Sequence, residues 1–222
     1  MSTTPAPREV GLLSVNVSLP EVLGRHRGHD IHSAIAKRPA AGPVLHLDDL
    51  NLEGDRQADL RVHGGPDKAV YAYPSEHLPA WSAELGQVLG PGAFGENLTT
   101  AGAVEADVAI GDVWAWGDAL LQVAQPRWPC FKLALHRRTG DMQARFRRSD
   151  RTGWYLRVLR AGDVPVAGPI RVAERDGAGV SVLDAHRATF PGVPPEAATR
   201  VVSVPALADE WRHIVERVLR SG

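Results

Sequence analysis

The stretch IGDVWAWGDALLQVAQPRWPCFKL, Ile110 to Leu133, carries the clearest structural signal in the chain. From Val113 to Ala124, apolar residues run on both sides of Gly117-Asp118, a dipeptide that favours a tight turn between two strands. This segment therefore predicts a β-hairpin. The second strand leads into two prolines, Pro126 and Pro129, which restrict the backbone just before the single cysteine of the chain, Cys130.

Short apolar stretches separated by turn residues recur along the chain. The sequence contains 22 glycines and 17 prolines, and this punctuation favours many short strands over a few long helices. Further strands are expected at Val10–Val17, Ala69–Tyr73, Trp154–Arg160 and Val164–Ala173. The last two are expected to pair as a hairpin around Ala161-Gly162-Asp163. The predicted fold class is mainly β with α, of the α+β type.

Three segments have helical spacing of their apolar residues. The first runs from Leu78 to Leu89, with Ser75 as its expected N-cap. The second is short, carries Met142 and Phe146, and has Asp141 as its expected cap. The third spans Leu207–Leu219 and is strongly amphipathic.

The sequence suggests two structural units. We place the boundary near Glu174, with a β-rich domain at residues 1–173 and a helical extension at residues 174–222. The segment PGVPP within the extension predicts an elbow between short helices. The apolar face of the last helix favours packing on its own core, with self-association into a homodimer as the alternative.

Composition restricts the classes of function. The chain has 25 Lys and Arg against 26 Asp and Glu, a net charge of −1, so no overall field attracts a nucleic acid polymer or an anionic membrane. No apolar run is long enough to span a bilayer, and the first residues lack the order of a signal peptide, so a soluble cytoplasmic protein is expected. One cysteine forms neither an internal disulfide nor a multi-thiolate metal site.

Cys130 has two readings from its local sequence. An isolated cysteine is most often a buried, inert residue. However, Arg127 and Lys132 lie three and two residues away, and nearby cations favour the thiolate, which attacks electrophiles and binds soft metals. The role of Trp128, between the two prolines, stays open between lining a pocket and packing beneath the loop.

Other polar stretches are weak signals when taken singly. In LRVHGGPDKAVYAYP, Gly64 and Gly65 free the backbone to approach an anion, with His63 and Lys68 as flanking donors, but taken alone the motif favours a plain turn with solvated charges. In PGAFGENLTTAG, Asn97 suits an amide-bearing heterocycle, whereas Glu96 suits a turn cap. HSAIAKRP, read alone, is typical of a short strand with a solvated Lys37.

Together these stretches resemble one family. HSAIAK, GDRQAD, VHGGPDKAVYAYPSEH, FGENLTTAG, the opening stretch and RTGWYLRVLRAG occur in the order and spacing of the MOSC domain family, named for the C-terminal domain of molybdenum cofactor sulfurases. The resemblance covers roughly Ile31 to Arg171 and is strongest to the stand-alone bacterial YiiM-like branch. It implies a β-barrel-like core and a molybdenum cofactor (molybdopterin).

The resemblance also implies site residues. Cys130 matches the family cysteine that contacts molybdenum or carries sulfur, because PRWPCFKL fits the family signature around it. Cations suit the terminal phosphate of the cofactor, and Asn97 suits the edge of its pterin. The expected cofactor-binding residues are Lys37, His63, Gly64, Gly65, Lys68, Asn97, Arg127 and Lys132.

Two functions follow from this resemblance. The first is a molybdenum-cofactor-dependent reductase of small N-hydroxylated compounds, with an external flavin or iron–sulfur electron donor, since the chain has no cysteine cluster and no GxGxxG motif of its own. The alternative is a module that carries the cofactor, or sulfur on Cys130, without turnover. The pyridoxal phosphate domain of sulfurases has no counterpart here, so a self-contained sulfurase is not expected.

Overall fold

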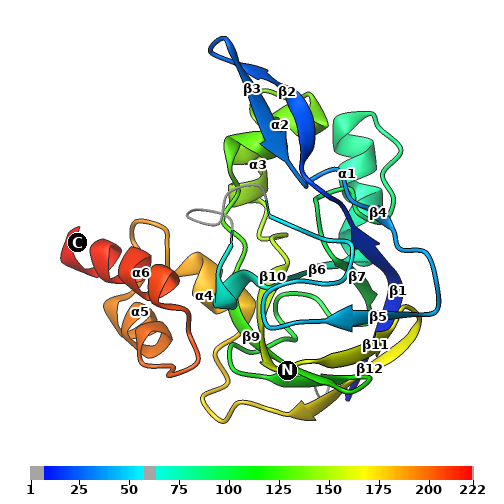
Figure 1. Cartoon of the computed structure of the whole chain (residues 1–222). Helices are drawn as coiled ribbons and strands as arrows, with labels where there is room; N and C mark the ends of the chain where they lie inside the picture. Colours follow the sequence, from blue (N-terminus) through cyan, green and yellow to red (C-terminus); the bar gives the residue numbers. More distant parts are fainter. Residues whose placement is uncertain (1–7, 58–63, 222) are drawn as a thin grey trace.

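A closed β-barrel forms the body of the protein, as a computed structural model shows for residues 8–57 and 64–221 (Figure 1). Seven strands close because β12 pairs with β8 on one side and with β1 on the other. Every pairing in the ring is antiparallel except that of β6 with β7. In ring order the strands are β12 (Gly168–Glu174), β8 (Val113–Trp116), β9 (Ala119–Pro126), β10 (Trp154–Arg160), β6 (Val70–Pro74), β7 (Leu98–Ala101) and β1 (Glu9–Val17).

Additional strands lie outside this ring. The strand β4 (Arg38–Pro39) extends the sheet at β1, and β5 (Val44–Leu47) pairs with β11 (Gly162–Pro165). The strands β2 (Glu21–His26) and β3 (His29–Ser33) form a separate hairpin that projects from the body at the top of Figure 1.

Helices cover two regions of the barrel surface. Short 3₁₀ turns, η1 (Pro66–Lys68) and η2 (Ser75–His77), flank β6. Helices α1 (Leu78–Leu85), α2 (Phe131–Arg137) and α3 (Met142–Arg148) gather at one end. The C-terminal helices are α4 (Val182–Arg187), α5 (Pro195–Val202) and α6 (Asp209–Ser221). No helix within the described residues is long and apolar enough to cross a membrane.

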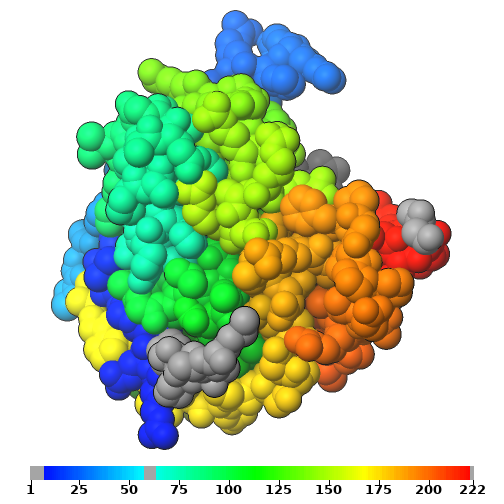
Figure 2. All heavy atoms as spheres, turned by 180° about the vertical axis from the view of Figure 1, so that it is seen from behind, coloured from blue at the N-terminus to red at the C-terminus, as the bar shows by residue number. Residues whose placement is uncertain are grey.

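The main core fills the barrel and extends beneath the C-terminal helices. Trp114 and Trp154 meet edge to face inside the barrel with their ring centroids 5.7 Å apart. Val182 and Trp211 belong to the same buried cluster, and Ala208 donates a backbone hydrogen bond to Ala124 of β9. Figure 2 shows the C-terminal helices, in orange and red, packed against the side of the body. The C-terminal helices thus share one buried core with the barrel. The division into two domains at Glu174 stays a prediction.

A second, aromatic core lies between the barrel wall and the helices α1 and α3. Tyr73, Trp81, Phe94 and Phe146 pack together there, and the Trp81 indole N–H donates to the Tyr73 hydroxyl at 2.8 Å. This cluster fixes the start of α1 and the loop before β7 against the wall.

Most of the predicted elements are confirmed, and the hairpin predicted at 154–173 is wrong. β10 pairs with β9 and β6, whereas the following segment divides into β11 and β12, which pair elsewhere. The turn at Ala161-Gly162-Asp163 therefore redirects the chain between different strand partners. Local turn signals do not determine this, because the pairing partners lie far away in sequence.

The predicted helix caps are also corrected. Ser75 begins η2 and does not cap α1, which starts at Leu78 with His77 in the cap position and ends at Leu85, since Gly86 adopts a left-handed conformation. Asp141 occupies the cap position of α3 as predicted, but its side chain makes no capping bond. It pairs instead with Arg145 at 2.9 Å.

We expect Gly153 to be indispensable to the barrel. Its φ of +61° is in the left-handed region, and a Cβ atom there would lie 2.3 Å from the carbonyl oxygen of Ala72. The variant Gly153→Ala should lose roughly 2 kcal/mol or more of unfolding free energy in urea titrations, because it combines a strained backbone with a steric clash. Gly140→Ala, where a Cβ meets nothing within 4 Å, should change it by less than about 0.5 kcal/mol. Equal effects of the two substitutions would contradict this account.

Candidate functional site

One cleft brings together most of the residues predicted from sequence. Its described lining includes six of the predicted residues, which come from separate loops, helices and turns. They are Lys37, Lys68, Asn97, Arg127, Cys130 and Lys132. Gly64 and Gly65 precede η1, which carries Lys68, and are not among the residues lining the cleft. His63 lies outside the described residues.

The lysines of this chain have an unusual distribution. Among the 25 basic residues only three are lysines, Lys37, Lys68 and Lys132, and all three line this cleft. Elsewhere the chain uses arginine as its cation. Because ammonium groups are compact point charges that bind phosphate and carboxylate oxygens, their gathering indicates a site for an anionic group.

Lys37 belongs to a buried polar network. Its ammonium pairs with Asp55, and both side chains are less than a tenth exposed. Burial lowers the pKa of Lys37, and the Asp55 carboxylate opposes that shift. The prediction of a solvated Lys37 is therefore wrong. The prediction of one short strand over HSAIAKRP is also corrected. Lys37 lies between β3 and β4.

Asn97 completes the same network. Its amide nitrogen donates to Asp55 at 2.8 Å and to the Asn16 carbonyl at 3.2 Å, while its amide oxygen accepts from the backbone N–H of Tyr71 at 3.1 Å. These bonds link β1, β6 and the entry of β7. Asn97 therefore lines the cleft as the residue that orients Asp55, and the pterin contact expected of it stays a prediction.

The loop before β7 is shaped by two glycines and a buried carboxylate. Glu96 accepts hydrogen bonds from the backbone N–H groups of Gly92 at 2.7 Å and Phe94 at 2.9 Å, which confirms its reading as a turn cap. A Cβ at Gly92 would lie 2.7 Å from the Lys37 carbonyl oxygen. The glycine therefore permits the close approach of this loop to the Lys37 backbone.

Arg127 forms a fixed positive charge in the cleft. It is about 5 % exposed, donates to the Phe94 carbonyl, and lies over the Tyr71 ring with 4.7 Å between the guanidinium carbon and the ring centroid. Guanidinium groups stay protonated in proteins. Arg127 is not ion-paired with any carboxylate among the described residues, so its charge is available to an anion.

Lys132 and Gln57 have polar atoms that the described protein leaves unsatisfied. Lys132, in the first turn of α2, is about 9 % exposed, and its side chain makes no hydrogen bond or ion pair with a described residue. The buried side-chain oxygen of Gln57 has no hydrogen-bond partner among the described residues either. The Lys132 side chain and the buried oxygen of Gln57 line one cleft, and such a donor and acceptor are the polar groups expected to bind a ligand.

Cys130 occupies the position just before α2, where the extended segment from Arg127 becomes helical. Its thiol is half-buried and lines the cleft together with Arg127 and Lys132, so the two cations near it in sequence are also near it in space. Trp128 does not line this cleft. It packs against Trp211 of α6 with the ring centroids 5.7 Å apart, which settles the question of its position.

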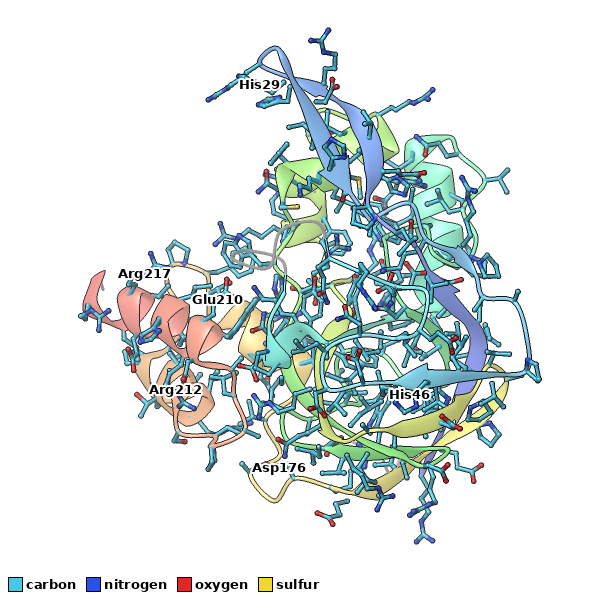
Figure 3. The ribbon with its side chains drawn as sticks, in the orientation of Figure 1. His29, His46, Asp176, Glu210, Arg212 and Arg217 are labelled. Atoms are coloured by element: carbon cyan, nitrogen blue, oxygen red, sulfur yellow. The ribbon has the colours of Figure 1, made fainter. Side chains whose placement is uncertain are left out.

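The C-terminal extension reaches the cleft through Glu210. This residue, in the first turn of α6, pairs with Lys68, and Figure 3 shows it at the end of α6 nearest the barrel. The next residue, Trp211, is fully buried and donates to the Ala185 carbonyl at 2.9 Å. The position of Glu210 is therefore fixed by the packing of the tail.

Sequence reasoning missed several residues of the cleft. Asp55 lies in the quoted GDRQAD stretch, and an acidic residue in a stretch matching a family of cofactor-binding proteins was the available signal. Tyr71 and Tyr155 line the cleft with their rings 5.1 Å apart, and burial raises the pKa of both phenols. Tyr155 lies in the quoted RTGWYLRVLRAG stretch, so the same signal was available for it. Nothing in the local sequence of Glu210 indicated a site, since its position depends on tertiary packing.

Comparison with known proteins identifies close relatives of this chain. A family profile described as "MOSC domain" matches residues 59–171. Protein YflK of Bacillus subtilis, described as uncharacterized, is 43 % identical over 90 % of both chains, and Protein YiiM of Escherichia coli is 37 % identical over 86 % of both. The crystal structure of YiiM from Geobacillus stearothermophilus superposes with a TM-score of 0.78 at 31 % identity, covering 95 % of this chain and 99 % of the other.

A longer protein contains a similar segment. A protein named "Reductase" from Gibberella moniliformis is 36 % identical over 84 % of this chain, and the match covers 33 % of that reductase. Two thirds of its length therefore lie outside the similarity.

We expect Asp55 to stabilise the fold strongly. The variant Asp55→Ala leaves the Lys37 ammonium buried without its carboxylate, so the unfolding free energy should fall by about 3–5 kcal/mol in urea titrations. Asp30→Ala removes the corresponding partner of an exposed pair, Arg25–Asp30, and should cost less than about 1 kcal/mol. If the two variants lose similar stability, the buried network does not have the structural role assigned to it.

Proposed function

The chain belongs to the MOSC domain family, and from this premise we propose that it binds the molybdenum cofactor in the Cys130 cleft and reduces N-hydroxylated compounds with electrons from a separate donor. The observation that carries the proposal is that the one thiol of the chain lines the same cleft as Lys132, whose side chain has no ion pair with a carboxylate of the described residues. The family relative named "Reductase" supports a redox reaction of this general kind.

The chemistry of the lining fits the cofactor. A thiolate is a suitable ligand for a soft metal, and Cys130 is the residue that supplies one. Lys132 and Arg127 provide positive charge for the terminal phosphate, with their own carboxylate partners lacking among the described residues. The unsatisfied oxygen of Gln57 is a hydrogen-bond acceptor for an N–H group of the pterin.

The reaction proposed is a two-electron reduction. A hydroxylamino group takes up two electrons and two protons, its N–O bond breaks, and the products are an amine and water. The bound cofactor supplies the redox change. On the protein side, burial raises the pKa of Tyr155, so its phenol stays protonated at neutral pH and can donate a hydrogen bond to the substrate hydroxyl.

We expect Lys132 to anchor the cofactor. Lys132→Met, made in cells that synthesise the cofactor, should lower its affinity by roughly 10- to 100-fold, because a hydrogen bond to a charged group is lost. Molybdenum analysis and fluorescence of the oxidised pterin measure the content of the purified protein. Arg171→Met, on the exposed face of β12, serves as the control and should leave the content unchanged. If the Lys132 variant retains its full cofactor content, the assignment of Lys132 to the anion site is wrong.

We expect Cys130 to be required for turnover more than for binding. Cofactor-loaded Cys130→Ser should lose roughly 100-fold or more of its rate with an amidoxime or hydroxylaminopurine and reduced methyl viologen as donor. Its pterin content should fall much less, because the cations of the cleft remain. If the cofactor-loaded wild-type protein reduces neither substrate, the proposed reductase function is wrong. Delivery of cofactor to an acceptor enzyme in that case would favour the carrier, and unchanged delivery by Cys130→Ser would exclude a sulfur relay through this residue.

A further inference from the structure

Residues 127–130, between β9 and α2, form an extended segment that carries Cys130 and that we call the wall. Its side chains lie on two faces. Arg127 and Cys130 line the cleft, whereas Trp128 and Pro129, between them in sequence, line hollows on the other side. The Pro129 carbonyl accepts a hydrogen bond from the Gln143 side chain of α3 at 3.0 Å, which fastens the wall to that helix. A molecule bound in these hollows would thus contact Pro129, which is adjacent to Cys130 in sequence.

Two adjacent hollows form this second face, and we refer to them together as the back groove. They have volumes of about 530 and 630 Å³ and share Trp128, Arg147 and Pro191. The groove runs from α3, past the wall, to the C-terminal half of α6, where Figure 3 labels Arg217. Its floor is aromatic and aliphatic, with contributions from Phe190, Ile214 and Val218.

The charged groups of the back groove are almost all positive. Arg147, Arg148 and Arg217 line it, against Asp141, which is paired with Arg145. The segment 131–150 contains six Lys and Arg and only two Asp, in a chain whose net charge is −1. This local excess of positive charge is complementary to an acidic surface and steers an acidic partner toward the groove.

The groove is also preorganised. The Arg147 guanidinium lies 4.6 Å from the Trp128 ring centroid and 5.0 Å from that of Phe190, and it donates to the Thr189 carbonyl at 3.2 Å. Trp128 is in turn held against Trp211. A central tryptophan and arginine that are already fixed lose little entropy on binding, which is typical of the centre of a protein interface.

We propose that the back groove is the docking site for the acidic flavin or iron–sulfur protein that supplies electrons to the Cys130 cleft. This inference rests on the proposed function, which requires an external donor. A lining of aromatic and aliphatic residues together with arginines matches a small, transient redox interface, and the transfer path is short because Pro129 of the groove is adjacent to Cys130. A second copy of this chain is disfavoured, because a two-fold interface here would oppose arginine to arginine.

The test compares two kinds of electron donor. Reduced flavodoxin and a reduced plant-type [2Fe–2S] ferredoxin serve as acidic protein donors, and reduced methyl viologen as a small donor that needs no docking surface. Arg148→Glu reverses one exposed charge of the groove. Ala144→Glu adds a negative charge there, and Ala144→Arg adds a side chain of similar bulk with the opposite charge. Arg171→Glu, an exposed arginine on β12, is the remote control.

With at least one protein donor, we expect Arg148→Glu and Ala144→Glu to lower kcat/KM for the donor roughly 10-fold at low ionic strength. Ala144→Arg and Arg171→Glu should change it much less, and higher salt should reduce the difference between the variants. Turnover with methyl viologen should be the same in all of them. Equal rates for all variants with both protein donors, or equal losses with viologen, would overturn the docking site.

Failure of the proposed function gives a different result. A wild-type protein that does not turn over with viologen lacks the activity itself, and the groove is then judged by binding of the oxidised donors in titration calorimetry. Binding that Arg148→Glu and Ala144→Glu weaken, and that Arg171→Glu does not, supports the docking site. No binding, or binding insensitive to these variants, overturns it, as does a groove that binds a single-stranded oligonucleotide and neither redox protein.

Discussion

The buried carboxylate of Asp55 connects the parts of the chain on which the cleft depends. It accepts from the Lys37 ammonium, from the Asn97 amide and from the backbone N–H of Ser18. These groups come from different loops, each following or preceding a different strand of the structure. A charge buried in this way is tolerated only when it is paired and hydrogen-bonded, so the loops have to converge on it. The network thereby fixes one side of the cleft, while Arg127 and Lys132 have no carboxylate partner among the described residues.

The opposite side of the cleft is built by a short, extended wall. Between the end of β9 and the start of α2, the chain has few residues in which to place groups on two faces. Arg127 and Cys130 lie on the cleft side, and Trp128 and Pro129 on the other. Prolines on both sides of Trp128 restrict the backbone, which helps to maintain this division. The same wall therefore relates the chemistry of the cleft to the properties of the groove behind it.

The C-terminal helices contribute to this arrangement. Trp211 anchors α6 in the core shared with the barrel and also supports Trp128, while its neighbour Glu210 pairs with Lys68 of the cleft. Arg212 adds hydrogen bonds to the carbonyls of Val204 and Leu207, which fix the turn before α6. Leu207 and Trp211 are buried in the core of their own chain, so these two residues are not available for self-association, and a homodimer stays a prediction.

The sequence by itself determined the strand-rich character of the fold, the hairpin at Val113–Ala124, the C-terminal amphipathic helix and the family of the chain. These features depend on turn chemistry and periodicity, which are local, or on several motifs in order. It also indicated Cys130 and the three lysines, whose common cleft the structure then displayed. Only the tertiary structure decided that β10 and β12 do not pair, that Lys37 is buried against Asp55, and that Glu210 reaches Lys68. The physical reason is that each of these contacts joins segments distant in the chain, and closure of the barrel and packing of the tail select among partners that local sequence leaves equivalent.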